Sequence, residues 1–124
     1  MTVPTFNYDE DGDILYVSFA PGETAMGILL NEQLLLRVNR TEHRVIGLTI
    51  MDYTMLAQVT ELGPRSVPLT DLQELAPELR ELALDVLQSP ELRPILTLTA
   101  YTPAAGELIP AVIVWPAATS VGTV

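Results

Sequence analysis

The sequence predicts an α+β fold: a mainly antiparallel β-sheet built from consecutive hairpins, covered by a helical segment, with a C-terminal β-hairpin. Three observations predict it. Apolar runs flank short polar turns in the first half, a leucine stripe of helical spacing follows, and two more apolar runs come near the end. A length of 124 residues with 48% hydrophobic side chains favours one domain over residues 1–124.

The first predicted hairpin turns at Asp11-Gly12. Glycine supplies the positive φ that a tight primed turn needs, and apolar and aromatic residues flank the pair on both sides. The loop is either these two residues or the four from Glu10 to Asp13.

Both loops give the same register, with Tyr8 opposite Leu15 and Phe6 opposite Val17. A three-residue loop would instead place Tyr8 opposite Tyr16. Because side chains alternate across a strand, the first register defines one face, which we expect to be buried. Its members are Phe6, Tyr8, Leu15, Val17 and Phe19.

Four acidic side chains surround this turn: Asp9, Glu10, Asp11 and Asp13. Their alternation is similar to the start of a calcium-binding loop. However, Ile14 stands where that loop needs glycine, and Ala20 stands where it needs a bidentate glutamate. We therefore predict a solvated turn that discourages edge-to-edge pairing, and no metal site.

Tyr8-Asp9, Asp13 and Leu15-Tyr16-Val17 together resemble the opening of a small prokaryotic domain-of-unknown-function family, DUF 2283. Members continue with a second hairpin, which here would be Leu36–Asn39 and Val45–Asp52. The resemblance spans about residues 5 to 56, and the sequence departs from the family pattern at His43, where glycine is usual. The family has no established activity, so the resemblance implies a fold but no particular function. It divides the chain into a family-like part, 1–58, and a helix with C-terminal strands, 59–124.

In the rest of the first half we expect a turn at Ala20–Glu23, a short strand within Thr24–Leu30, and a strand pair at about Gln33–Asn39 and Arg44–Met51. Leu34-Leu35-Leu36 is apolar on both faces of its strand. Such strands are covered on both sides, so we expect a helix or another subunit on each face.

Residues 60–69 are predicted to be a connection, followed by a helix with Thr70 as N-cap and Gln73 completing a capping box. Pro77 either kinks this helix or begins a second one, and we favour two segments, about 71–75 and 77–88. The stripe expected to cover the sheet is Leu72, Leu75, Leu79, Leu82 and Val86, and the expected solvent face is Glu78, Arg80, Glu81 and Asp85.

The last two predicted strands are Ile95–Tyr101 and Ile109–Trp115, joined by a loop at Thr102–Leu108. Pro110 has no N–H for a ladder, so it belongs at a sheet edge or at a strand's start. A bare apolar strand would aggregate, so we expect the last one to pair within its sheet or across a subunit interface.

Composition excludes several kinds of site. The net charge is −10, the six basic residues are all arginine, and there is no cysteine. Nucleic-acid binding, disulfides and thiolate chemistry are therefore not expected. Arg37, Arg40 and Arg44 gather with His43 around one hairpin; this set is either an anion or partner patch or, as we favour, a polar tip that faces carboxylates.

No nucleophile elbow, phosphate loop or zinc-protease motif occurs. Asp13 and Asp52 are the carboxylates best placed for catalysis, because each borders an apolar strand, and His43 is the one candidate base. We favour turn acids and a solvated histidine, and predict no catalytic, cofactor-binding or metal-binding residue.

The function expected from these patterns is a non-catalytic cytoplasmic module that forms a homodimer or binds another protein. One alternative is an antitoxin-like partner that neutralises a basic protein. The other is a small carboxylate-dependent enzyme. The first residues show no signal-peptide pattern and no apolar run is long enough for a membrane span, so no membrane contact is expected.

Overall fold

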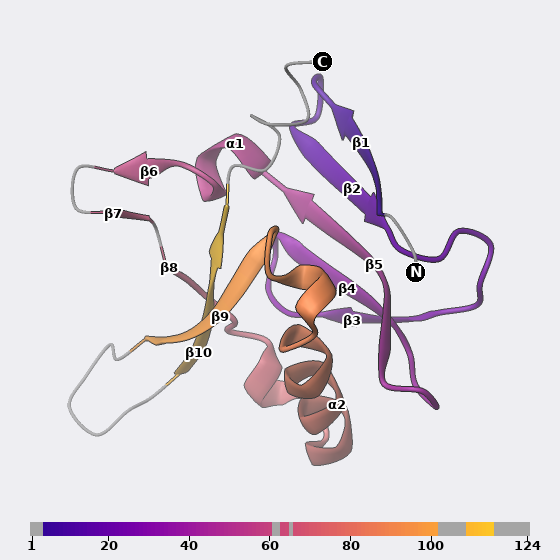
Figure 1. Cartoon of the computed structure of the whole chain (residues 1–124). Coiled ribbons are helices and arrows are strands. Elements are labelled where there is room, and N and C mark those ends of the chain that lie inside the picture. The colour runs from indigo at the N-terminus through magenta and orange to yellow at the C-terminus, as the bar shows by residue number, and fades with distance from the viewer. Residues whose placement is uncertain (1–3, 61–62, 65, 102–108, 116–124) are drawn as a thin grey trace.

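The computed structural model describes residues 4–60, 63–64, 66–101 and 109–115, and for residues 59, 60, 63, 64, 100 and 101 it describes the backbone alone (Figure 1). It is mainly antiparallel sheet with one main helix, so the α+β prediction is confirmed. The predicted loop at 102–108 lies outside the described residues.

The first half of the chain forms a five-stranded antiparallel sheet with strand order β1-β2-β5-β4-β3. Its strands are β1 (Thr5–Asp9), β2 (Ile14–Ser18), β3 (Met26–Leu29), β4 (Leu34–Asn39) and β5 (Arg44–Met51). The second strands of the two predicted hairpins, β2 and β5, pair with each other, so the hairpins join into one sheet.

The register of the first hairpin is the predicted one: Tyr8 pairs with Leu15 and Phe6 with Val17. The loop has the four-residue form, because the ladder ends at Asp9 and Ile14 and does not include Glu10 and Asp13. The turn chemistry differs from the prediction: positive φ falls on Asp13, at 55°, and not on Gly12. An aspartate tolerates the left-handed region when its short side chain finds local hydrogen bonds, and Asp13 has them.

The second half supplies a three-stranded antiparallel sheet with order β8-β10-β9, formed by β8 (Ser66–Pro68), β9 (Leu96–Tyr101) and β10 (Ile109–Val114). The prediction of a plain connection at 60–69 is wrong, since β8 and a short ribbon of β6 (Val59–Thr60) and β7 (Gly63–Pro64) lie there. Proline and glycine hid these strands from a reading based on turn residues. The apolar strand β10 pairs with β8 on one side and with β9 on the other, so it pairs within its own sheet. Pro110 lies near the start of β10.

The helical segment begins with a 3₁₀ helix, η1 (Leu72–Glu74), and continues as α2 (Pro77–Leu87), so the prediction of two segments is confirmed, with Pro77 in the first turn of α2. The capping box is not formed, because neither helix start has a side-chain cap hydrogen bond. Arg80, predicted to face solvent, instead donates to the carbonyls of Leu72, Gln73 and Leu75. Two further short helices are α1 (Tyr53–Leu56) and the 3₁₀ helix η2 (Pro90–Leu92).

One hydrophobic cluster joins the two halves of the chain. It contains Leu15, Val17, Leu36 and Ile50 from the five-stranded sheet, and Leu82, Val86, Leu92, Val112 and others from the second half. Of the predicted core face, Leu15, Val17 and Phe19 are buried and Phe6 packs against the cluster, whereas Tyr8 is 37% exposed. The helix and the second sheet thus cover one face of the five-stranded sheet.

Asn31 ties the two layers together at one end. Its amide donates to the carbonyl of Pro68 at 3.0 Å, and its Oδ1 accepts from the N–H groups of Gln33 and Leu34. The N–H of Asp71 donates to Leu30 beside it. Among the described side chains, Asn31 is the one polar or charged residue that is buried. No periodic pattern in the sequence indicated it.

Candidate functional site

The face of the five-stranded sheet that points away from the core carries a row of side chains across four strands. Tyr16 pairs with Thr49, Thr49 with Leu35, and Leu35 with Leu29. We call these four residues the outer row. Tyr16 is 43% and Leu29 46% exposed, while Leu35 and Thr49 are half-buried. The described elements therefore leave the ends of an apolar row open to solvent.

Strand alternation explains this row. Leu34 and Leu36 point into the core, so Leu35 between them must point outward, and Tyr16 lies in the same way between buried Leu15 and Val17. The sequence predicted that both faces of β4 would be covered, by a helix or by another subunit. Among the described residues, the helix and the second sheet cover one face; cover of the other face, which carries Leu35, by another subunit stays a prediction.

Two charged residues stand at opposite corners of the outer face. Arg37, which pairs with Gly47, lies two residues from the outer row along its strand. Asp9, which pairs with Ile14, lies two residues from the row in the opposite direction, on the edge strand β1. A Cβ at Gly47 would lie 3.1 Å from the carbonyl oxygen of Val17, which is a tight contact, and 3.5 Å from Nη1 of Arg37, an ordinary one, so the arginine side chain lies over the glycine. Within the described residues Arg37 makes no ion pair or hydrogen bond.

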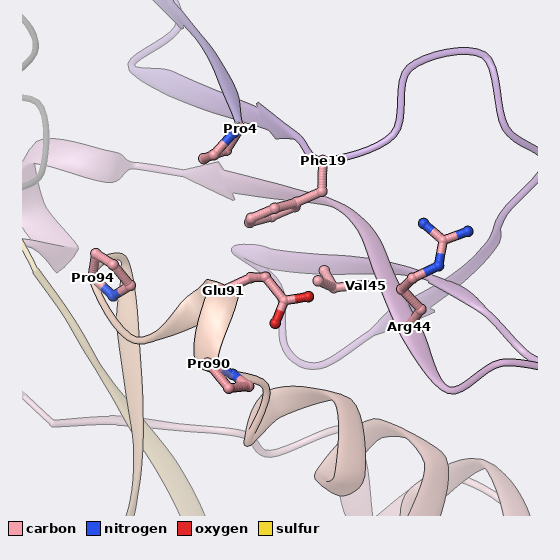
Figure 2. Close-up of a pocket in the computed structure, with 7 residues that line it drawn as sticks. All are labelled: Pro4, Phe19, Arg44, Val45, Pro90, Glu91 and Pro94. Atoms are coloured by element: carbon pink, nitrogen blue, oxygen red, sulfur yellow. The ribbon is translucent and has the colours of Figure 1, made fainter. Parts of the chain in front are cut away.

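A pocket of about 550 Å³ opens on another side of the molecule, between the end of β2, the start of β5 and the η2 helix. Its lining residues are Pro4, Phe19, Arg44, Val45, Pro90, Glu91 and Pro94 (Figure 2). The walls are largely apolar, with two charged side chains among them. Figure 2 shows the Glu91 carboxylate reaching into the space beneath the Phe19 ring, while the Arg44 guanidinium turns away from it.

Arg44 is already neutralised. It donates to the carboxylates of Glu23 and Glu42, and these hydrogen bonds raise its pKa above the ordinary value. Glu91, in contrast, makes no ion pair or hydrogen bond within the described residues. The pocket therefore holds one paired cation and one unpaired carboxylate.

The other basic residues near the β4–β5 turn are paired as a polar hairpin tip would be. Arg40 lies 3.8 Å from a carboxylate oxygen of Glu78, and Nδ1 of His43 lies 2.7 Å from Oδ2 of Asp85. These four side chains are largely exposed. His43 therefore fastens the hairpin to α2, and it does not line the pocket.

The Asp13 carboxylate is held by hydrogen bonds from Tyr8 and Thr54. It accepts from the Tyr8 hydroxyl at 2.6 Å, from the Thr54 hydroxyl at 2.7 Å and from the Thr54 N–H at 3.2 Å. These hydrogen bonds, that of Tyr8 first, lower the pKa of Asp13, and the same carboxylate raises the pKa of Tyr8 to about 12. A carboxylate held by three donor groups clamps the first turn to α1.

Asp52 lies next to Asp13, because Ile14, which follows Asp13, pairs antiparallel with Met51, which precedes Asp52. Asp52 also has positive φ, at 54°, and its side chain is exposed with no hydrogen bond to the helix that it precedes. Neither acid lines the pocket beside Phe19. Across the described part of the chain, no three His, Asp or Glu side chains come close enough to hold a metal ion.

Comparison of the chain with family models, with curated proteins and with solved structures finds no match. The resemblance to DUF 2283 therefore stays a prediction. No helix within the described residues is long and apolar enough to cross a membrane.

Proposed function

We propose that this chain is a homodimeric module that works through protein contact, with the outer face of the five-stranded sheet as its interface. The observation that carries the proposal is the outer row, Tyr16, Thr49, Leu35 and Leu29, of which the first and last side chains are nearly half exposed. Burying such apolar and aromatic surface stabilises association by about 25 cal/mol per Å² before the costs of docking.

A second copy is the partner that best fits the charge of this face. Two chains of net charge −10 repel each other at long range, so they can approach closely only through uncharged surface. The outer row is uncharged, and so are Ile14 and Met51 beside it. A symmetric dimer uses one patch twice, which requires only that the patch complement itself.

The corners of the face favour a particular orientation. Consider a two-fold axis that passes between Tyr16 and Thr49, parallel to the sheet and at about 45° to the strands. This axis would bring each Arg37 to the partner's Asp9. It would also cross the two sheets near a right angle, which is one of the preferred sheet packings. Both arginines would then gain a carboxylate partner, which Arg37 lacks among the described residues of one chain. This charge complementarity is a second reason to favour a copy of the chain over a different protein.

The test is the solution mass at micromolar concentration, measured by light scattering after size-exclusion chromatography. The wild-type chain should give twice 13.5 kDa, and Leu29→Glu or Tyr16→Glu should give the monomer. Met55→Glu is the matched control, because Met55 is equally exposed at 44% but lies on α1. A wild-type chain that stays monomeric would overturn the proposal.

Charge reversal tests the orientation. Arg37→Asp and Asp9→Arg should each weaken the dimer about tenfold, the equivalent of about 1.4 kcal/mol, and the double variant should recover most of the loss. Failure of the double variant to recover would reject this orientation, while the mass measurement above would still decide the dimer itself.

A further inference from the structure

The pocket beside Phe19 has the size and the walls of a small-molecule site. Its volume of about 550 Å³ falls within the roughly 300–1,000 Å³ typical of ligand pockets. Three prolines, Pro4, Pro90 and Pro94, form part of its lining, and a proline ring fixes its own backbone φ. A pocket with such a lining is largely preformed, which lowers the entropy lost when a ligand binds.

The charges around the pocket decide what kind of ligand fits. Arg44 is occupied by two carboxylates, those of Glu23 and Glu42, so it offers little to an anion. Arg44, Glu23 and Glu42 together carry a net charge of −1. Glu91 adds a further negative charge, and it has no partner within the described residues. A bound cation would therefore gain an ion pair, whereas a bound anion would meet a net charge of −2.

The aromatic wall favours the same sign of charge. The face of a phenyl ring carries negative charge density and attracts ammonium groups. Phe19 lines the same pocket as Glu91, and in the view of Figure 2 its ring lies above the carboxylate. Val45 and the prolines add apolar surface for a hydrocarbon body. The lining thus offers apolar walls and one anionic group, which belongs to the exposed residue Glu91.

We infer that this pocket binds a small organic cation, an ammonium group on a compact apolar body. The ammonium would lie against Glu91 and the Phe19 ring, and the hydrocarbon part against Val45 and the proline lining. The chain contains no lysine, so a second copy has no side-chain ammonium to place there. The site is separate from the outer face of the sheet, so it does not depend on the homodimer proposal.

The test compares three probes of nearly equal shape: isopentylammonium, the neutral 3-methylbutan-1-ol and the anionic isovalerate. Each is titrated into isotopically labelled full-length protein, and the backbone amide signals of Val45, Glu91 and Leu92 are followed by NMR. The ammonium should bind at least tenfold more tightly than the alcohol, and isovalerate should produce no shift at these positions. Equal binding by the alcohol, tighter binding by isovalerate, or no binding by the amine would overturn the inference.

Two variants locate the binding. Glu91→Gln should remove the preference for the ammonium over the alcohol, while Glu81→Gln, an exposed glutamate on α2 that does not line the pocket, should leave it unchanged. Phe19→Leu retains an apolar wall and should weaken ammonium binding several-fold more than alcohol binding. A lysine peptide, N-acetyl-lysine amide flanked by glycines, is the last arm; tighter binding of this peptide than of the free amine would assign the pocket to a protein side chain and reject a small-molecule ligand.

Discussion

The β1–β2 and β4–β5 hairpins are built on the same loop but fasten it to the rest of the molecule in different ways. In each, four residues join the strands and the last of them has left-handed backbone geometry, with φ of 55° at Asp13 and 51° at His43. In each, the residue just before the loop accepts a backbone N–H with its side chain: Asp9 from Asp11 and Asn39 from Glu42.

The tertiary contacts of the two left-handed residues differ. Asp13, itself half-buried, accepts three exposed hydrogen bonds from Tyr8 and Thr54 that join the first turn to α1. His43 makes one contact, with Asp85 on α2, and both side chains are more than half exposed. A strained backbone of similar cost is thus compensated strongly in one hairpin and weakly in the other, and the two should respond differently to substitution.

The largest effect is expected at Asp13. Asp13→Ala removes the acceptor of three exposed hydrogen bonds and leaves a non-glycine residue without polar side-chain atoms at positive φ. The free energy of unfolding should therefore fall by about 1–2 kcal/mol. Chemical denaturation measures it. Asp13→Gly is the control, because glycine accepts the backbone geometry; its loss should be smaller by about 1 kcal/mol. Equal losses for the two variants would mean that the backbone at Asp13 is not strained.

The next effect is the pH dependence of the same cluster. The pKa of Asp13 is lowered, so its contribution to stability is present above its ordinary value of 3.8 and is lost as pH falls through the folded-state pKa. The pKa of Tyr8 is raised from 10.0 to about 12, so its contribution is present below pH 10.0 and is lost as pH rises toward about 12.

Absorbance at 295 nm, followed against pH, should show a tyrosine that ionises near 12 and that disappears in Tyr8→Phe. In Asp13→Asn that transition should move toward 10.0, since the carboxylate hydrogen bond is its first cause. An unchanged high-pH transition in Asp13→Asn would contradict the clamp.

The smallest effect is expected at His43, and it has the opposite sign. His43→Gly places the residue that favours positive φ at this position, and loses only an exposed pair, so stability should rise by about 0.5 kcal/mol at neutral pH. Asp85→Asn separates the two contributions, because it removes the pair and leaves the backbone unchanged; it should change stability by only a few tenths of a kcal/mol. A clear loss in His43→Gly would show that the pair with Asp85 outweighs the strain.

The sheet of consecutive hairpins could be predicted from the sequence because its signals are local. Tyr8, Leu15, Phe6 and Val17 alternate about a turn, and that pattern admits few registers. The left-handed residue was placed wrongly, at Gly12, because a four-residue loop and a two-residue loop share one register but differ in which residue closes the turn. β8 was missed because a three-residue strand ending in proline carries almost no periodic signal.

The pocket was not predictable from the sequence. Phe19, Arg44 and Glu91 come from three separate parts of the chain, and none belongs to a motif. Arg44 pairs with Glu23 and Glu42 and not with Glu91, and that choice depends on the tertiary arrangement of these segments. The sequence placed Asp13 and Asp52 at strand ends, but only the fold made one of them an acceptor for three donor groups.

The sequence by itself determined the class of the fold, the two hairpins, the two-part helical segment and the apolar character of both faces of β4, because each follows from neighbouring residues and a fixed period. The tertiary structure decided which of those faces the helix and second sheet would cover, and which charged side chains would lack a partner. These outcomes depend on packing between distant segments, and local periodicity contains no information about that packing.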